Sequence, residues 1–252
     1  MNLFDYSIKR RSKLKEYYAN SFHKDEWKRD IQFTLEFGQK VGPTFIELME
    51  LSKSQFRQDI FALTELGFKK NGFFVEFGAT NGVTLSNTYL LEKRFGYNGI
   101  LSEPNPKQLG DIRKQRTSFV DNSCVWRETG QTLKFIERGD LSTLENFSEL
   151  DMHGEKRKGR PKFDVETISL SDLCRKYHAP AQIDYLSIDT EGSELEILSH
   201  HKFDEYTFKV ITVEHNYTKN RDKIFSLLTS NGYERKFEHL SHTDDWYSLK
   251  NS

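Results

Sequence analysis

Residues 72–82 read Gly-Phe-Phe-Val-Glu-Phe-Gly-Ala-Thr-Asn-Gly, a short apolar run that leads into a turn with two glycines. The stretch that follows, residues 84–94, has helical spacing, so the order is strand, glycine turn and helix, as a nucleotide-cofactor loop requires. Gly78 and Gly82 let the backbone turn sharply and approach a ligand, and the helix points its first N–H groups at the turn. Taken alone, such a loop is equally typical of an ordinary connection between a strand and a helix.

An acidic residue ends the next apolar run, where a ribose-binding carboxylate is expected. Glu103 lies roughly 20 residues after the last glycine of the loop, which is the usual offset of that carboxylate in nucleotide-binding folds. Pro104 and Pro106 follow it and stiffen the loop that holds it. The glycine loop and the acid together favour a nucleotide cofactor over a surface glutamate at a strand end.

From residue 54 onward, short apolar runs alternate with helical stretches, which predicts a parallel sheet wrapped by helices. We expect strands at about 73–78, 98–102, 117–121, 183–188 and 207–214, and helices near 54–66, 84–94, 106–115, 169–177, 193–200 and 219–230. A polar turn between residues 233–240 and 246–250 predicts an antiparallel hairpin at the end of the chain. Residues 126–135, interrupted by Thr129-Gly130, predict a small hairpin insert.

The chain of 252 residues is expected to form a helical N-terminal extension over residues 1–53 and one domain over 54–252. The extension is either a solvated helical cap or a substrate-binding lid. A net charge of -1 argues against a general nucleic-acid or membrane-surface binder. No uncharged apolar run approaches the roughly 18 residues of a membrane span, and the two cysteines form no CxxC spacing. We therefore expect a cytoplasmic protein with two reduced thiols.

Five separated segments carry a more specific signal than the glycine loop alone: Ser54-Gln-Phe-Arg-Gln-Asp59, Phe74-Val-Glu-Phe-Gly-Ala-Thr-Asn-Gly82, Leu85-Ser-Asn-Thr88, Ser102-Glu-Pro-Asn-Pro106 and Ile188-Asp-Thr-Glu-Gly-Ser-Glu194. In order and spacing, these segments resemble the FkbM methyltransferase family over about residues 54–250. The resemblance implies an α/β, class I methyltransferase (Rossmann-like) fold, with a seven-stranded, mostly parallel sheet and a C-terminal antiparallel hairpin. It also implies S-adenosyl-L-methionine as the cofactor.

The resemblance assigns cofactor contacts residue by residue. Glu76, Gly78 and Gly82 would hold the methionine and ribose side of the cofactor, and Glu103 the ribose hydroxyls. Thr80 replaces the middle glycine of the loop, which is a mild departure from the family pattern. The other expected cofactor contacts are Asn81, Ser86, Asn87, Thr88, Pro104 and Asp189, with Asn122 and Ser123 near the adenine.

The fourth and fifth strands of the expected sheet end in Asp189-Thr-Glu191 and Glu214-His-Asn216. These side chains should converge at the carboxyl edge of a parallel sheet, where ligands bind. The arrangement resembles the metal-dependent O-methyltransferases of small molecules, which implies Mg²⁺ or another divalent cation held by Asp189 and Glu214, with His215 or Asn216 completing the site. Asp189, Glu214 and His215 are our candidate catalytic groups, with His215 as the general base. Alternatively, Asp189 and Glu191 cap the next helix.

Glu191 and Asn216 are candidate substrate contacts, as are Lys158 and Arg160 of the basic segment 156–162, which could meet an acceptor phosphate. We expect a small-molecule or glycan acceptor, phosphorylated or nucleotide-linked, and no nucleic acid; the sequence does not determine the oligomeric state. Our preferred function is O-methylation of a sugar hydroxyl in the biosynthesis of surface polysaccharide or another glycan, which rests on the family resemblance. Three alternatives stay open: an N-methyltransferase of a small phosphorylated amine, an NAD-binding oxidoreductase, and a non-catalytic nucleotide-binding module.

Overall fold

The computed structural model describes residues 24–150 and 153–250. The chain divides into two compact units, residues 1–46 and 47–252, so the boundary falls inside helix α3 (Phe45–Leu51). The described part of the first unit is helical, with α2 (Lys24–Val41) and the short 3-10 helix η1 (Gly42–Thr44) ahead of α3. The ring of Phe33 stacks on that of Phe37, with 4.3 Å between their centroids. Residues 1–23 of the expected N-terminal extension lie outside the described residues.

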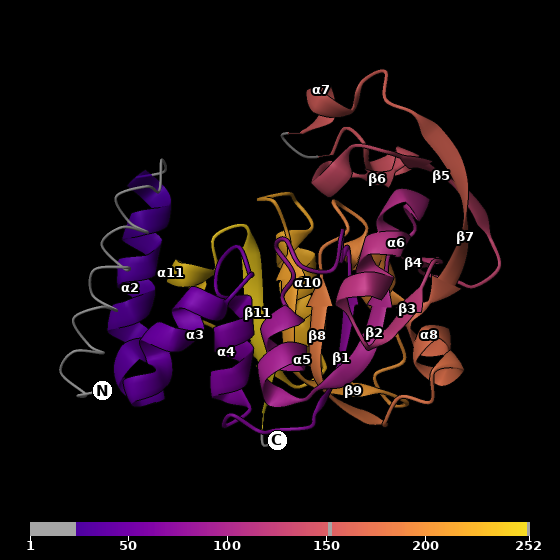
Figure 1. Ribbon diagram of the computed structural model, residues 1–252. Coiled ribbons are helices and arrows are strands. Elements are labelled where there is room, and N and C mark those ends of the chain that lie inside the picture. Colours follow the sequence, from indigo (N-terminus) through magenta and orange to yellow (C-terminus); the bar gives the residue numbers. More distant parts are fainter. Residues whose placement is uncertain (1–23, 151–152, 251–252) are drawn as a thin grey trace. The chain divides into compact units, whose positions relative to one another are not determined.

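The second unit is built on a sheet for which the described residues supply seven strands, in the order β10-β11-β9-β8-β1-β2-β3 (Figure 1). Strands β3, β2, β1, β8 and β9 are parallel to one another, and β11 runs antiparallel between β9 and β10. The expected class I fold and its terminal hairpin are therefore confirmed. The strands are β1 (Phe73–Phe77), β2 (Asn98–Ser102), β3 (Phe119–Asp121), β8 (Gln182–Ile188), β9 (Thr207–Glu214), β10 (Tyr233–Lys236) and β11 (Asp244–Leu249).

The helices of this unit follow the expected order: α4 (Gln58–Glu65), α5 (Tyr89–Phe95), α6 (Pro106–Gln115), α8 (Leu170–Lys176), α9 (Glu194–Ser199) and α10 (Arg221–Ser230), with the short α11 (Glu238–Ser241) inside the terminal hairpin. Two begin later than we expected. Helix α4 begins at Gln58, because Arg57 has a left-handed φ of 68°. Helix α5 begins at Tyr89, because residues 86–88 before it donate hydrogen bonds to the buried Glu76 carboxylate of β1. None of the helices in the described part of the chain has the length and apolar character of a membrane span.

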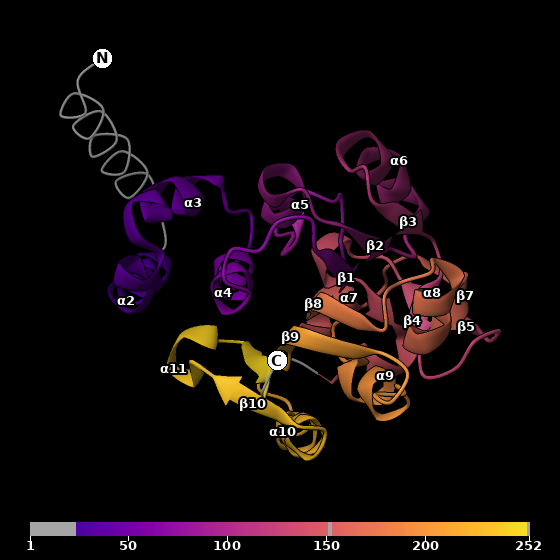
Figure 2. The ribbon, with the colours of Figure 1, turned by 90° about the horizontal axis from the view of Figure 1, so that it is seen from below.

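The two faces of the sheet differ in chemistry because side chains alternate along a strand. On one face, residues such as Leu186 and Val213 join the main apolar cluster with residues of α8, α9 and α10. The other face carries polar groups, among them Tyr185, whose hydroxyl hydrogen-bonds Thr212 at 2.7 Å. Figure 2 shows α4 and α5 on one side of the sheet and α9 and α10 on the other. The polar face leads toward the carboxyl edge of the sheet.

An insert between β3 and α8 forms a second sheet, with β4 (Cys124–Trp126), β5 (Thr132–Ile136), β6 (Thr143–Leu144) and β7 (Lys162–Ser169) in the order β4-β7-β5-β6. The hairpin that we expected over residues 126–135 is wrong, because β4 and β5 both pair with β7, which lies between them. The pairing buries Trp126, Phe135 and Val165 in a separate apolar cluster. The insert also contains the 3-10 helices η2 (Gly139–Leu141) and η3 (Glu145–Phe147) and the short helix α7 (Gly154–Arg157).

Candidate functional site

The glycine loop brings the end of β1 against the end of β8. Gly78 has a φ of +73°, and a Cβ atom at this position would lie 1.9 Å from the carbonyl oxygen of Asp189. Gly82 has a φ of +78°, and its Cβ would lie 3.0 Å from the side chain of Arg116. Thr80, between them, is also left-handed, with a φ of 45°. A side chain at Gly78 would force the loop away from the sheet edge, so this glycine sets the close approach.

Glu76 organises the loop from within. Its buried carboxylate accepts hydrogen bonds from the Ser86 hydroxyl at 2.9 Å, the Asn87 backbone N–H at 2.7 Å and the Thr88 hydroxyl at 2.5 Å. The guanidinium of Arg116 donates hydrogen bonds to the hydroxyl oxygens of Ser86 and Thr88. The structure thus joins Glu76 and residues 86–88 into one buried network, which explains why these residues do not continue helix α5.

Two side chains of this region keep acceptor atoms suited to a ligand. Glu103, buried at the end of β2, accepts the backbone N–H groups of Thr80 and Asn105 at 3.1 and 2.9 Å. Burial raises the pKa of Glu103 to about 7. The buried Oδ1 of Asn87 has no hydrogen-bond partner among the described residues, while its Nδ2 donates to Ser187. A polar cofactor that spans these acceptors fits the chemistry of the loop.

The remaining predicted cofactor residues lie around the same loop. Asn81 accepts the backbone N–H groups of Val83 and Thr84 and so closes the turn. Pro104 is half-buried, and Asn122 is exposed after β3. Ser123 donates its backbone N–H to Asp121 at 2.7 Å. The ends of β2 and β3 are joined by a backbone hydrogen bond from Glu103 to Asp121.

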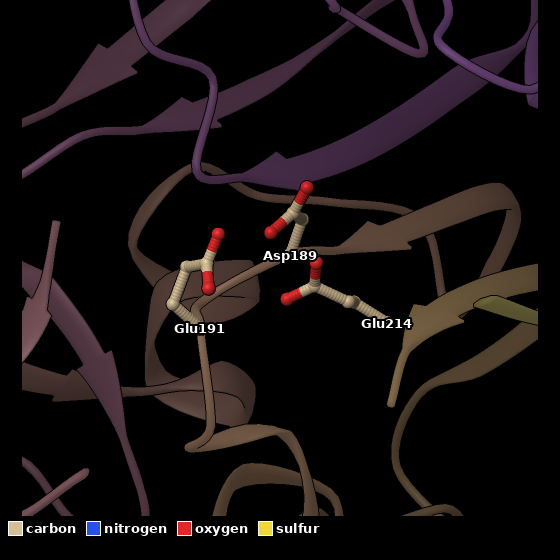
Figure 3. A group of neighbouring side chains, drawn as sticks. All are labelled: Asp189, Glu191 and Glu214. Carbon is tan, nitrogen blue, oxygen red and sulfur yellow. The ribbon is translucent and has the colours of Figure 1, made fainter. Parts of the chain in front are cut away.

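Three carboxylates face one another at the carboxyl edge of β8 and β9 (Figure 3). One oxygen of each of Asp189, Glu191 and Glu214 lies within 4.8 Å of the others. Burial, and then the neighbouring Glu194 carboxylate, raises the pKa of Asp189. Burial, and then Asp189 and Glu191, raises the pKa of Glu214 well above its usual range. The structure therefore concentrates negative charge in a poorly hydrated place, where a proton or a cation is favoured.

Further polar groups, which the sequence did not indicate, surround these carboxylates. Burial and the charge of Asp189 raise the pKa of Asp244 to about 8, and Gln58 donates to Asp244 at 2.8 Å. Arg157, almost fully buried, donates to Glu191 at 2.7 Å. Arg157 belongs to the basic segment 156–162, from which we had predicted Lys158 and Arg160, and not Arg157, as substrate contacts.

The other predicted substrate and catalytic residues take different places. Asn216 donates from Nδ2 to Glu191 at 3.3 Å. His215 is buried and turns toward Asp245, with Nε2 3.7 Å from Oδ1, while its Nδ1 accepts the backbone N–H of Tyr217. Burial lowers the pKa of His215 to about 4. The group of ligand atoms within the described residues thus contains Glu191 where we had expected His215.

The exposed basic residues lie on the short helix α7 and after it. Lys158 is exposed and pairs with Glu155 at 2.5 Å, and Arg160 is also exposed.

Glu194 takes the helix-capping role that we had considered as the alternative for Asp189 and Glu191. Its carboxylate accepts the backbone N–H groups of Thr190 and Gly192, both at 3.0 Å. The acids at the strand end are therefore not needed for those two N–H groups.

The parallel sheet with an antiparallel terminal hairpin, the glycine loop and the acid that ends β2 define a class I, S-adenosylmethionine-dependent methyltransferase. The sequence model of the Methyltransferase FkbM domain matches residues 76–235, and the chain belongs to the FkbM methyltransferase family. This result supports an S-adenosylmethionine-dependent methyltransferase over the oxidoreductase and the non-catalytic module.

Solved structures of methyltransferases resemble the chain. The methyltransferase FkbM from Methylobacillus flagellatus KT matches with 13% identity and a TM-score of 0.46, over 89% of this chain and 61% of that one. The precorrin-6y C5,15-methyltransferase from Geobacter metallireducens GS-15 matches with 14% identity and a TM-score of 0.41, over 79% and 92%. Aeropyrum pernix fibrillarin with natively bound S-adenosyl-L-methionine matches with 12% identity and a TM-score of 0.39, over 77% and 76%. Comparison with curated proteins finds no match.

Proposed function

We propose that this methyltransferase transfers a methyl group to a sugar hydroxyl in the biosynthesis of surface polysaccharide or another glycan, with a divalent cation bound by Asp189, Glu191 and Glu214. The observation that carries the proposal is the convergence of these carboxylates beside the glycine loop. Because Gly78 lies directly against the backbone of Asp189, a cofactor in the loop and an acceptor at the carboxylates would be neighbours.

The ligand chemistry supports a hard cation such as Mg²⁺. Carboxylate oxygens are the ligands that Mg²⁺ and Ca²⁺ prefer, and carboxylates this close repel one another unless a cation or a proton intervenes. Arg157 offsets the charge of Glu191. A bound cation would polarise the acceptor hydroxyl and lower the pKa of its proton.

The residues of the chain supply the rest of the reaction. S-adenosylmethionine, when bound, supplies a methyl group activated by its sulfonium. Glu103 and the backbone around Gly78 would orient the cofactor, and the carboxylate oxygen of Asp189 or Glu214 that does not bind the cation would accept the proton that the acceptor oxygen loses as it bonds to the methyl carbon. The oxygen–methyl bond forms while the methyl–sulfur bond breaks, and S-adenosylhomocysteine leaves.

The sugar acceptor fits the polar lining of the site. The carboxylates and the Asn216 amide, which contacts Glu191, can bind hydroxyl groups as acceptors and donors. Lys158 and Arg160 are exposed on the insert, and we assign them to a phosphate or nucleotide group of the acceptor. An N-methyltransferase of a phosphorylated amine would use the same basic residues and a carboxylate base, but no cation.

A homocysteine-release assay with a panel of sugar nucleotides and phosphorylated amines tests the function. We expect turnover with a sugar nucleotide in Mg²⁺ or Mn²⁺, at least tenfold loss of kcat in excess chelator, and a similar loss in Asp189→Asn. Glu205→Gln, which removes an exposed acid that pairs with Arg175 and Lys202, is the control and should retain activity. Chelator-insensitive turnover of an amine would contradict the proposal.

A further inference from the structure

The loop after β9 holds an exposed tyrosine in an unusual backbone conformation. Tyr217 is 57% exposed. Its φ is 53°, and that of the preceding Asn216 is 45°. Non-glycine residues in the left-handed region are uncommon, and they persist where the surrounding structure holds them. Two such residues in succession indicate that the position of this ring is constrained.

Hydrogen bonds from both sides hold the loop. The backbone N–H groups of His215 and Asn216 donate to the same carbonyl oxygen, that of Thr243, at 2.8 and 3.1 Å. The N–H of Tyr217 donates to Nδ1 of His215 at 3.0 Å. The Tyr217 ring also meets the rings of His215 and His242 edge-on, at centroid distances of 5.2 and 6.1 Å. The ring is therefore presented to solvent by a fixed frame.

The loop that holds Tyr217 is linked to the carboxylate group of Asp189, Glu191 and Glu214. Glu214 ends β9 three positions before Tyr217, and the adjacent Asn216 reaches the Glu191 carboxylate with its amide. Other large aromatic residues of this unit cannot offer a face to a ligand in the same way, because Trp126, Trp246 and Tyr247 are all buried. Tyr217 thus combines exposure with a place in the chain next to Asn216, whose amide contacts a carboxylate of the predicted acceptor position.

We propose that Tyr217 forms one wall of the acceptor subsite and stacks on the apolar C–H face of a pyranose ring, whose hydroxyls meet the carboxylates and Asn216. An aromatic ring offers an apolar face with negative charge density, which suits polarised C–H groups. The neighbouring carboxylates and amide suit hydroxyl groups. Tyr217 would determine the preference for a ring-shaped acceptor, and this inference rests on the proposed sugar O-methyltransferase.

The test compares Tyr217→Ala, Tyr217→Phe and a control, Leu51→Ala, which truncates a partly exposed apolar residue at the end of α3. Methyl pyranosides and UDP-linked hexoses are the probes, with binding measured by saturation-transfer NMR and turnover by homocysteine release. Loss of the ring should raise the pyranoside Kd and KM about tenfold, with a smaller change in kcat. Tyr217→Phe should stay within about twofold of wild type, and the Kd of S-adenosylhomocysteine should be the same in all variants.

The two readouts separate this inference from the function on which it rests. Pyranosides that bind wild type without being methylated, and bind Tyr217→Ala more weakly, would support the subsite and overturn the sugar methyltransferase. Methylated pyranosides with equal KM in Tyr217→Ala and Leu51→Ala would overturn the subsite and keep the function. Absence of both binding and turnover with wild type would overturn both.

Discussion

Replacing Arg157 with methionine should destabilise the domain strongly, because it removes one partner of the buried ion pair with the Glu191 carboxylate. The two side chains are 1% and 7% exposed and lie 2.7 Å apart. Removing one partner of a buried ion pair typically costs about 3–5 kcal/mol. The guanidinium of Arg157 also donates to the carbonyl oxygen of Leu141 at 2.7 Å and to that of Ser148 at 3.3 Å. The variant would lose these contacts within the insert as well.

For a domain of this size, 3–5 kcal/mol corresponds to a fall in Tm of roughly 6–20 °C. Thermal and urea unfolding in chelator would measure the change. Lys162→Met is the matched control: Lys162 pairs with Glu145, but the side chains are 46% and 43% exposed, so its loss should cost at most about 1 kcal/mol.

A double-mutant cycle separates the ion pair from the rest of the Arg157 contacts. Glu191→Gln in the Arg157→Met background removes the stranded charge, so the two substitutions together should cost at least about 2 kcal/mol less than their sum. A stability of Arg157→Met within about 1 kcal/mol of wild type, or additive costs in the cycle, would show that the pair does not hold the insert against Glu191.

Three further predictions concern the loop and the histidine. Burial raises the pKa of Glu103 to about 7, so its carboxylate is about one-tenth ionised at pH 6 and about nine-tenths ionised at pH 8. Because the ionised carboxylate is the form that accepts the ribose hydroxyls, calorimetry should show that S-adenosylhomocysteine binds up to about ninefold more tightly at pH 8 than at pH 6. The Glu103→Gln variant should show no such pH effect. Gly78→Ala should abolish calorimetric cofactor binding because its Cβ would meet Asp189 at 1.9 Å, whereas Gly110→Ala, with nothing within 4 Å, should bind normally. His215→Ala should lower Tm by several degrees and kcat less than tenfold, since Nδ1 accepts the Tyr217 N–H and Nε2 lies on the side of Asp245, 3.7 Å from Oδ1 and away from the carboxylates; a hundredfold loss of kcat with unchanged stability would instead make His215 the base.

The sequence predicted the sheet well because most of its parallel strands are short apolar runs bounded by polar or glycine-containing turns. It also placed Asp189 and Glu214 at one edge, since the carboxyl ends of neighbouring parallel strands must meet there. It failed for residues 84–88, where helical spacing is overridden by the hydrogen bonds that the Glu76 carboxylate accepts. It also failed for the insert, because the pairing of β5 with β7 joins residues 132–136 to 162–166 across a long loop.

The directions in which the side chains point at the carboxyl edge of β8 and β9 could not be predicted from the sequence. Glu191 enters the carboxylate group from a backbone with a φ of 59°, which no spacing rule indicates for glutamate. Adjacent residues of a strand point to opposite faces, so Glu214 and His215 could not both be assigned to one site from their proximity in sequence. The structure turns Glu214 toward Asp189 and His215 toward Asp245.

The raised pKa values of Asp189, Glu214 and Asp244 and the proposed cation have one physical origin. Each carboxylate is removed from water and placed near others, so the ionised group is stable only when positive charge accompanies it. Arg157 pairs with the Glu191 carboxylate. Protons can provide further compensation when no cation is bound, and a cation would displace them. The same carboxylates can then hold the acceptor oxygen by metal coordination or by hydrogen bonds, but only a carboxylate oxygen that carries neither a proton nor the cation can take a proton from a hydroxyl group.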